Sequence, residues 1–591
     1  MYVMGISGIH GGVDEHRRRY TDDDERLSGF VQGLDSAAVL VRDGIVVAAA
    51  AEERFTGRKG TGDFPTHAIE YCLNSAGIEA ADLEAAAHAF HYVLHPGTEA
   101  LDSAWTRAYR SLFRPERQID LWKRFLGVLP RQGVLPVAHH LAHARSSFDL
   151  SGFDRAAVIV SDGMGEAESM TLFHAKGDEL LPVQRVSSSH SLGLLYSLVT
   201  YHLGFRPGMD EYKVMGLASF GDPDRYSSAF EDLVRSRPEG RYVIPFLNEE
   251  TDTRGRELHV AARRSLTRLF GPPRQPGDEV VDEHRDLAAA LQRRTEDIVL
   301  HVTRWARDTT GETTLCLAGG VALNCTANGK ILDSGLFEQL FVQPAAGDDG
   351  SALGAALAVS RNLGRPAPVE RMTVPYWGEC HDDQALRTAA LQRPEFTVEV
   401  FDDDRSLAAR VADAITAGSI VAWYQGGMEF GPRALGNRSI LADPRHADTR
   451  DRLNARIKKR EDFRPFAPAV KSEAAHRLFH ISPGSELAYA HMVVLTRTRA
   501  EHAASLAAVT HVNGTARVQT VERQNNPRFW SLLDALEERT GYPVVLNTSF
   551  NVQGQPIVRT PREAFDTAVD ADLDGLVVGR CYLRRRTGDA A

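Results

Sequence analysis

The sequence contains little cysteine and no cysteine pairing pattern. Its five cysteines are scattered over 591 residues, and no two of them form a CxxC pair. This spacing argues against a disulfide framework and against a thiolate zinc site. We therefore predict a protein of a reducing compartment, the cytoplasm.

The chain also lacks a long apolar run and an excess of positive charge. No stretch approaches the roughly 20 apolar residues needed to cross a bilayer, and the first residues, MYVMGISGIHGG, have no basic head followed by an apolar segment. The formal net charge is −11, which argues against a general nucleic-acid binder. We expect an unexported protein with neither a membrane nor nucleic acid as partner. Its length and its hydrophobic content of 43% predict two or more folded domains.

Two histidines four residues apart and a later aspartate form the most reactive pattern in the chain. On a helix, His139 and His143 lie on one face, about one turn apart, with the geometry to chelate one divalent metal ion, while His140 points elsewhere. An isolated HxxxH is more often a helix cap or a core histidine. Asp162 favours the metal site, because it ends an apolar run (156–160) typical of a buried strand and is followed by glycines that suit a turn beside a ligand.

Strand patterns occur twice in the same arrangement. The first set comprises residues 2–7, 36–42 and 45–51, the last two joined by the hairpin signal Asp43-Gly44. The second set comprises 156–161, 169–174 and 180–186, with a turn at Lys176-Gly177. In both sets a strand leads through a loop with Asp or Gly into a hairpin. This repetition predicts an internally duplicated α/β domain.

The segments between these sets have different characters. The charged residues 11–33 predict a solvated loop or a short helix. Apolar side chains at helical spacing predict one or two amphipathic helices within 95–133, beginning near Trp105 and Tyr109, which either pack on the core or shape an acceptor pocket. Residues 196–203 and 287–308 have helical patterns, and the polar, Gly- and Pro-rich residues 238–282 predict a surface excursion.

A glycine pair follows a further apolar strand pattern at residues 315–324, LCLAGGVALN. Gly319 and Gly320 let backbone amides approach phosphate or ribose oxygens closely, and the helix that follows favours negative charge at its amino end. Downstream, GDDG at 347–350 precedes an Ala-rich helix. Asp348 or Asp349 therefore lies where a strand meets a helix, a location suited to ligating a metal.

The second half of the chain concentrates cations near glycine-rich turns. Residues 362–375 contain three prolines and few apolar residues, which places a domain boundary there. The following glycine-rich loop (425–439) and later segments supply arginine, lysine and small polar residues. Guanidinium forks and backbone amides together can share the oxygens of a phosphate-bearing substrate. Any single arginine of a chain with 68 basic residues is more often solvated, so the association with turn glycines carries this interpretation.

On these residues the chain resembles the carbamoyltransferase family that includes nodulation protein U, the cephem 3'-hydroxymethyl O-carbamoyltransferase and tobramycin carbamoyltransferase. The resemblance covers nearly the whole length and rests on long motifs in the family's order. These motifs are EERFT (52–56), HHLAHARSSF (139–148), DEYKVMGLASFG (210–221), LAGGVALNC (317–325), GDDGSALGAAL (from 347), MEFGPRALGNRSILADPR (428–445), FRPFAPAV (463–470), THVNGTARVQTV (510–521) and LNTSFNVQGQPIV (546–558).

The resemblance implies an α/β protein with two domains. Residues 1–365 would form an actin-like, sugar-kinase (ASKHA) domain with duplicated halves, similar to the tRNA threonylcarbamoyl-transfer enzyme. Residues 371–591 would form a YrdC-like domain that converts carbamoyl phosphate and ATP to carbamoyladenylate. The first domain would then pass the carbamoyl group to a hydroxyl of an acceptor.

The family's functional residues carry over to this chain by motif. The metal ligands would be His139, His143, Asp162 and Asp348, holding iron(II), with zinc and manganese as alternatives. The carbamoyl phosphate and ATP site, with Mg²⁺ accompanying ATP, would use Arg433, Lys458, Arg464, Arg517, Asn547 and Ser549, with Arg433 and Lys458 also acting in catalysis. The nucleotide site of the first domain would use Glu211, Lys213, Gly319, Gly320 and Asn324.

Two positions depart from the family pattern. Family members usually carry His-Asp before the Ser-Ala-Ala strand, whereas this chain has Leu34-Asp35. If that histidine is the base for the acceptor hydroxyl, another group must act, and His10 and Asp35 are the candidates. Gly427 replaces a usual arginine, with Arg438 and Arg445 nearby in sequence.

We predict an ATP-dependent O-carbamoyltransferase of secondary metabolism, such as antibiotic biosynthesis, that acts on a hydroxylated small molecule. One alternative is a kinase or ATPase of the actin-like superfamily. The other is a non-catalytic regulator that binds nucleotide and metal. The sequence does not name the acceptor, and a homodimer is the base-rate expectation for a soluble enzyme.

Overall fold

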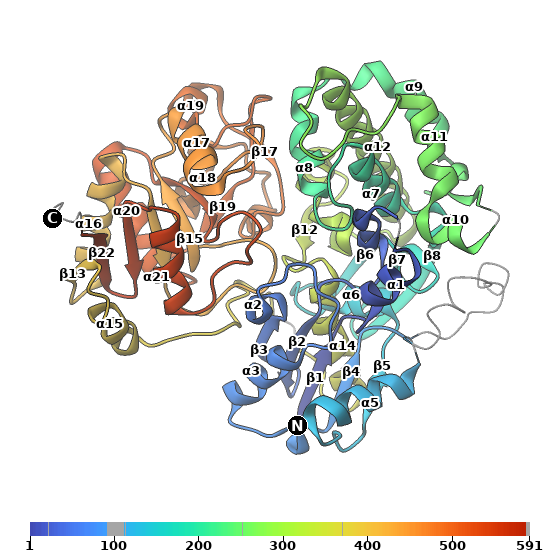
Figure 1. Cartoon of the computed structure of the whole chain (residues 1–591), viewed down its shortest axis with the longest axis horizontal. Coiled ribbons are helices and arrows are strands. Elements are labelled where there is room, and N and C mark those ends of the chain that lie inside the picture. The colour runs from blue at the N-terminus through green and yellow to red at the C-terminus, as the bar shows by residue number, and fades with distance from the viewer. Residues whose placement is uncertain (22, 92–111, 113, 251, 369, 587–591) are drawn as a thin grey trace. The chain divides into compact units, whose positions relative to one another are not determined.

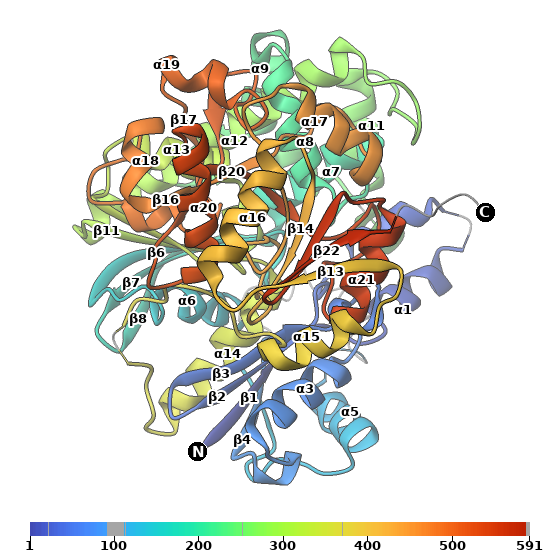
Figure 2. The same ribbon diagram turned by 90° about the vertical axis from the view of Figure 1, so that its left-hand side faces the viewer.

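The computed structural model describes the chain except residues 22, 92–111, 113, 251, 369 and 587–591 (Figures 1 and 2). Its internal contacts define two units. The first comprises Met1–Glu53 and Gly60–Met372, and the second comprises Arg54–Lys59 and Thr373–Ala591. Trp105 and Tyr109, expected on an amphipathic helix, lie outside the described residues.

The first unit contains two five-stranded sheets with the same strand order. One sheet runs β3 (Ile45–Ala51), β2 (Ala37–Arg42), β1 (Tyr2–Ile6), β4 (Ala85–His88) and β5 (Val134–Pro136). The other runs β8 (Glu179–Ser187), β7 (Glu168–Lys176), β6 (Arg155–Ser161), β11 (Thr314–Ala318) and β12 (Gln339–Val342). In each sheet the first three strands are antiparallel and the last two run parallel to the central strand. The predicted duplication of an α/β domain is confirmed.

The two hairpins follow from local turn chemistry. The β2–β3 turn uses Asp43 and Gly44, both at positive φ (50° and 82°), which is the conformation that Asp-Gly turns favour between twisted strands. The β7–β8 turn contains Gly177 at φ 53°. In each sheet, helices connect the hairpin to the parallel strands that complete the sheet.

Helices of the first unit cover the sheets and fill the segments between them. They are α1 (Gly12–Arg19), α3 (Thr66–Ala76), α5 (Pro115–Leu126), α6 (His139–Phe148), α7 (Leu192–His202), α8 (Glu211–Leu217), α9 (Ser227–Leu233), α10 (Thr253–Leu258), α11 (Val260–Phe270), α12 (Asp282–Thr310), α13 (Cys325–Asp333) and α14 (Asp348–Asn362). The short α2 (Glu53–Thr56) follows β3. The helix patterns at 196–203 and 287–308 are confirmed by α7 and α12, and that within 95–133 by α5.

The prediction of a mere surface excursion at 238–282 is wrong. This stretch contains α10 and α11, and it buries Phe246, Leu258 and Leu266. The stretch is rich in polar residues and glycine, so its few apolar residues gave no helical pattern. Burial of these few side chains is enough to pack the two helices against neighbouring elements. The charged residues 11–33 form α1 and a 3-10 turn, η1 (Glu25–Phe30), as expected, although His16 and Leu27 are buried.

Close packing of α6 against α14 positions the reactive residues. A Cβ at Gly354 would lie 1.6 Å from the carbonyl oxygen of Ala142, so only glycine lets the two backbones approach this closely. A Cβ at Gly5 on β1 would similarly meet the carbonyl of Ala352. The amino ends of α6 and α14 therefore come together, with β6 ending beside α6.

The second unit is built on one eight-stranded sheet. Its order is β13 (Phe396–Val400), β22 (Cys581–Arg585), β21 (Gly575–Val578), β14 (Val421–Tyr424), β15 (Arg438–Ala442), β20 (Val544–Ser549), β16 (Ala467–Lys471) and β19 (Gln519–Val521). Its α-helices are α15 (Asp383–Leu391), α16 (Asp404–Thr416), α17 (Asp448–Arg452), α18 (Ser472–Leu478), α19 (Ala500–Ala503), α20 (Pro527–Thr540) and α21 (Pro561–Asp570). Figure 2 shows α16 and α20 side by side, and they pack over Trp423, Leu441 and Val545 as one apolar core.

No described helix has the length and apolar content required to cross a membrane.

Candidate metal centre and anion-binding edge

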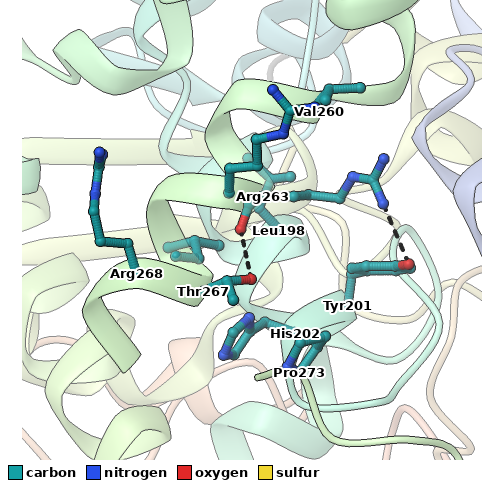
Figure 3. A pocket seen from close by; sticks show the side chains of 10 residues that line it. Leu198, Tyr201, His202, Val260, Arg263, Thr267, Arg268 and Pro273 are labelled. Carbon is teal, nitrogen blue, oxygen red and sulfur yellow. Dashed lines mark hydrogen bonds between the residues drawn. The ribbon is translucent and has the colours of Figure 1, made fainter. Parts of the chain in front are cut away.

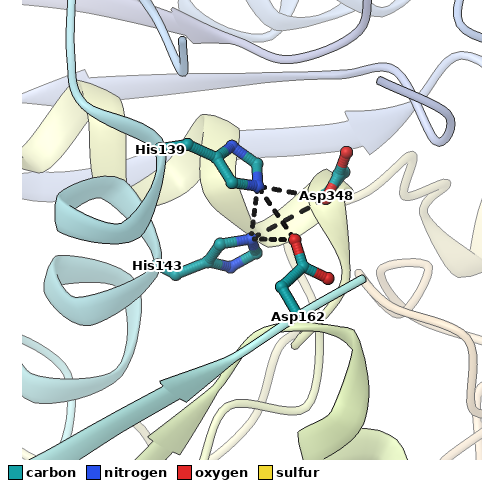
Figure 4. Close-up of side chains that lie close together, drawn as sticks. All are labelled: His139, His143, Asp162 and Asp348. Carbon is teal, nitrogen blue, oxygen red and sulfur yellow. Dashed lines mark hydrogen bonds and ion pairs between the residues drawn. The ribbon is translucent and has the colours of Figure 1, made fainter. Parts of the chain in front are cut away.

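Four side chains of the first unit converge where α6, α14 and β6 meet (Figure 4). His139 and His143 project from the first turns of α6, Asp162 follows β6, and Asp348 begins α14. One ligand atom from each of the four lies within 4.8 Å of all the others. The structure therefore brings together the four residues that the sequence predicted as metal ligands.

The distances between these donor atoms match the size of a divalent ion. Two donors at about 2.1 Å from one tetrahedral ion lie about 3.4 Å apart. The Nε2 atom of His139 lies 3.1 Å from Asp162 Oδ2 and 3.5 Å from Asp348 Oδ1. The Nε2 atom of His143 lies 3.1 Å from that of His139, and 3.8 and 3.7 Å from the same carboxylate oxygens. The four donors thus surround a space of ionic dimensions.

Hydrogen bonds around these donors leave their lone pairs directed inward. The Nδ1–H of His139 donates to the carbonyl of Ala89 (3.0 Å), which leaves Nε2 as the lone-pair atom. Asp162 Oδ1 accepts from the amides of Gly163 (2.8 Å) and Gly320 (3.2 Å), so its other oxygen faces the histidines. Two imidazole lone pairs 3.1 Å apart repel each other unless a cation lies between them. This donor set fits a divalent metal ion.

The pKa shifts of the cluster also favour a cation at its centre. Burial alone would lower the pKa of His139, but Asp348 and Asp162 outweigh it and raise that pKa well above its usual value. Burial would raise the pKa of Asp162, yet the histidines lower it. The pocket therefore favours positive charge at its centre, supplied by a proton or by a metal.

The glycine pair, Gly319 and Gly320, lies beside this centre. A Cβ at Gly319 (φ 86°) would lie 2.3 Å from the carbonyl oxygen of Ser161, so the loop can pass the end of β6 only as glycine. The amide of Gly320 then reaches Asp162. Asn324 caps α13 through Ala327 N–H and bonds the side chain of Gln292, which is a structural role.

The other predicted nucleotide residues have defined partners. Glu211 is partly buried and accepts from Ser197 Oγ (2.6 Å) and the amide of Gly208 (2.7 Å), and desolvation raises its pKa. Lys213 forms an ion pair with Asp210 (3.2 Å). Glu211 thus ties α8 to α7, and its part in nucleotide binding stays a prediction.

The two candidate bases lie in different surroundings. Asp35, at φ 63°, has Oδ2 4.0 Å from the position a Cβ would take on Gly347, the residue before the ligand Asp348. His10 Nδ1 instead accepts from the amide of Phe64 (3.2 Å). Leu34 approaches Gly208, where a Cβ would lie 3.5 Å from its side chain. Of the two candidates, the structure brings Asp35 next to the segment that carries a metal ligand.

Strand directions in the second unit gather its predicted residues at one sheet edge. β14 and β20 end there, whereas β15, β16 and β19 begin there. The loop with Arg433, the residues before β16 with Arg464, Arg517 before β19, and Ser549 at the end of β20 therefore share this edge. We call it the anion-binding edge, after the role that the sequence predicts for these residues.

Lys458 occupies a buried position at this edge. It is 4% exposed, and its ammonium donates to the carbonyls of Ser549 and Asn551 and to Asn551 Oδ1 (3.0 Å). Burial, and then Arg460, Arg464 and Lys59, lower its pKa well below the usual value. A group of like charges around a buried lysine is a site that an anion would stabilise.

The structure gives Asn547 a packing role and explains why residue 427 is glycine. The amide of Asn547 donates to Gln519 Oε1 (2.8 Å) and to the carbonyl of Ala434, which fixes the loop that carries Arg433. A Cβ at Gly427 would lie 2.6 Å from the carbonyl oxygen of Tyr376, so an arginine does not fit this backbone.

Neither nearby arginine is available to replace that cation. Arg438 is fully buried and donates to the carbonyls of Gln425, Gly426 and Glu379. Arg445 pairs with Asp443. Both are held by intramolecular contacts, so neither replaces the arginine that the resemblance led us to expect in place of Gly427.

His511 lies in the motif THVNGTARVQTV (510–521) and was not among the predicted site residues. Thr515 donates its hydroxyl to Asn513 Oδ1 (2.7 Å), so Thr515 Oγ1 accepts from His511 Nδ1–H (3.1 Å). The lone pair then resides on Nε2, which is buried and has no hydrogen-bond partner in the described part of the chain. Burial, reinforced by Arg517, lowers the pKa of His511 to about 3. His511 is therefore a neutral imidazole beside Arg517, and no spacing rule reveals this arrangement.

The sequence also did not predict that the segment Arg54–Lys59 packs with the second unit. Arg54 Nη2 donates to the carbonyl of Gly431 (3.1 Å), and the Arg559 guanidinium lies 4.7 Å from the ring of Phe55. Although it follows β3 in the chain, the segment thus belongs to the second unit. Its motif, EERFT, is conspicuous in sequence but carries no sign of this partner.

Comparisons with known proteins identify the family. Residues 110–357 match the carbamoyltransferase N-terminus family and residues 412–585 match the carbamoyltransferase C-terminus family. The chain is 42% identical to nodulation protein NolNO of Sinorhizobium fredii, over 94% of this chain and 79% of that protein. It is 32% identical to the 3'-hydroxymethylcephem-O-carbamoyltransferase of Streptomyces clavuligerus, over 64% of this chain and 66% of that protein. The chain belongs to the carbamoyltransferase family and is an enzyme of that class.

Among solved structures, HypF of T. kodakarensis superposes with a TM-score of 0.30 at 12% identity, covering 61% of this chain and 48% of that one.

Proposed function

We propose that the chain is an ATP-dependent O-carbamoyltransferase with two reaction centres. The anion-binding edge takes carbamoyl phosphate and ATP to carbamoyladenylate, and the metal centre hosts transfer of the carbamoyl group to an acceptor hydroxyl. The observation that carries the proposal is the presence, in one chain of this family, of a buried lysine with cationic neighbours, Lys458, and of a four-donor centre at His139.

The first reaction balances with one water. Water releases phosphate from carbamoyl phosphate and leaves carbamate, whose oxygen attacks the α-phosphorus of ATP and expels pyrophosphate. Arg433, Lys458, Arg464 and Arg517 would bind the phosphate oxygens, because several cationic donors are needed for such anions. The neutral imidazole of His511 would accept a hydrogen bond from the carbamoyl amide.

In the second reaction the acceptor oxygen attacks the carbamoyl carbon, and AMP leaves with the adenylate oxygen. His139, His143, Asp162 and Asp348 would hold the metal ion, which when bound supplies positive charge that stabilises anionic oxygens. Asp35 would accept the proton of the acceptor hydroxyl. The acceptor is a hydroxyl-bearing small molecule, by analogy with the hydroxymethyl group in the name of the cephem enzyme.

Product analysis separates this proposal from its alternatives. The full-length enzyme incubated with carbamoyl phosphate and ATP should release pyrophosphate, with AMP appearing when an acceptor is present. Release of ADP would instead identify a kinase or ATPase. Binding of nucleotide without any product would identify a regulator.

Asp35→Asn should slow acceptor carbamoylation by about 100-fold, because an amide cannot accept the hydroxyl proton. Pyrophosphate release should stay within about twofold of the unmodified enzyme. His10→Gln serves as the control, and its rate of carbamoylation should change little, since its Nδ1 is engaged by the amide of Phe64. A large loss with His10→Gln and none with Asp35→Asn would reverse the assignment.

Binding of carbamoyl phosphate should be coupled to proton uptake. The pKa of Lys458 is held low by burial and by Arg460, Arg464 and Lys59, and a bound anion favours the charged lysine and raises this pKa. Protons are therefore taken up on binding, so affinity falls as pH rises between the two pKa values. Calorimetry in two buffers of different ionisation enthalpy measures this uptake; equal enthalpies in both would contradict it.

A further inference from the structure

A cavity of 440 Å³ in the first unit lies between α7 and α11 (Figure 3). Its size falls in the range of small-molecule sites, about 300–1,000 Å³. The lining residues are Leu198, Tyr201, His202, Val260, Arg263, Arg264, Leu266, Thr267, Arg268 and Pro273. Nothing in the proposed reaction uses this cavity.

One face of α11 supplies the basic side chains. Val260, Arg263, Arg264, Thr267 and Arg268 are spaced three or four residues apart, or are neighbours, so they share one side of the helix. The lining contains three arginines and neither aspartate nor glutamate. In a chain of net charge −11, this is a local excess of positive charge.

Two of these arginines carry uncompensated charge. Arg264 and Arg268 are exposed at their helix positions, and within the described residues neither forms an ion pair. Arg268 donates one bond, to Ser265 Oγ (3.0 Å). Surface arginines are often simply solvated, but here they border a cavity that has an ordered wall.

The third arginine is already held in place. Arg263 Nε donates to the carbonyl of Leu258 (2.9 Å), and its guanidinium lies 5.5 Å from the ring of Tyr201, toward whose hydroxyl it points in Figure 3. The Tyr201 hydroxyl donates in turn to Asp24 (3.1 Å). A guanidinium fixed before a ligand arrives loses less conformational entropy on binding.

The cavity lies away from the metal centre. At the amino end of α7, Ser191 donates to the carbonyl of Gly163, next to the ligand Asp162. Tyr201 and His202 end the same helix, about 16 Å along its axis for eleven residues. The cavity is thus a second location, one helix length from the four donors.

We propose that this arginine-lined cavity is a binding site for a phosphate-bearing small molecule, formed by residues that belong to neither proposed reaction centre. Phosphate oxygens suit this lining, because Arg263, Arg264 and Arg268 each keep N–H donors that no described residue accepts from, and a phosphate offers more acceptor oxygens than a carboxylate does. The inference rests on the cavity alone and holds whether or not the proposed reaction is correct.

Crystals of the full-length protein grown with tungstate, a phosphate mimic, test the site directly through anomalous scattering. We expect a peak in the cavity against the α11 arginines. A peak at the anion-binding edge with none in the cavity would overturn the proposal, because it would show that the anion reached the protein and bypassed this site.

A solution experiment uses pyrophosphate as the probe. It should protect the amides of residues 260–270 from hydrogen exchange, and in the double variant Arg264→Gln/Arg268→Gln the midpoint concentration should rise at least about tenfold. Arg304→Gln, an exposed arginine of α12, is the matched control and should not move the midpoint. Absence of protection, or an unchanged midpoint in the double variant, would refute the site.

Discussion

Replacing His143 with alanine should remove the metal ion and lower acceptor carbamoylation by at least about 100-fold, while pyrophosphate release continues. The physical reason is that His143 Nε2 is one of only four donors in the described cluster, and loss of one donor exceeds the 10- to 100-fold cost of losing a supporting partner. Metal content by elemental analysis and the two product assays measure the effects separately.

The control for this variant is His301→Ala. His301 lies on α12 and bonds backbone carbonyls of Arg237 and Arg241, so its loss removes an imidazole without touching the four donors. It should retain metal and both activities. Joint loss of pyrophosphate release and transfer in a folded, metal-free His143→Ala enzyme would show that the two reactions share one centre, contrary to the proposal.

Replacing Lys458 with methionine should have the opposite pattern. Pyrophosphate release should fall by about 100- to 1,000-fold, because a buried cation that meets developing negative charge contributes that much to such reactions. Metal content at the His139 centre should be unchanged. Methionine keeps the apolar stem of the buried side chain, so circular dichroism and the thermal midpoint should report a folded protein.

Lys471→Met is the matched variant in the same unit. Its ammonium pairs with Asp534 (2.7 Å) and Glu537 (2.9 Å), so its charge is already neutralised and its replacement should alter stability more than turnover. A Lys458→Met enzyme that releases pyrophosphate at the unmodified rate would remove the anion-binding edge from the mechanism.

The metal centre could be anticipated because each ligand has a local signature. His139 and His143 share a helix face by spacing alone, Asp162 ends a visible apolar strand, and Asp348 begins a helix after another strand. What spacing does not contain is the approach of α6 to α14 through Gly354. That contact joins residues two hundred positions apart, and it decides whether the four donors meet.

The duplicated sheets were predictable for a related reason. Asp43-Gly44 and the alternating apolar runs specify hairpins within a few residues. By contrast, α10 and α11 were missed because their few apolar anchors are diluted by polar residues. His511 was missed because its importance arises from the hydrogen-bond chain through Thr515 and Asn513 and from its burial, and neither follows from residue type.

The grouping of Arg54–Lys59 with the second unit bears on how this enzyme can be taken apart. A polypeptide that starts at Thr373 would contain every strand of the eight-stranded sheet and still be incomplete. It would leave the Gly431 carbonyl without the Arg54 guanidinium and Arg559 without the Phe55 ring. To express the second unit by itself, the six residues Arg54–Lys59 would have to be attached to it. Cutting the gene between the halves would divide one folding unit between two chains.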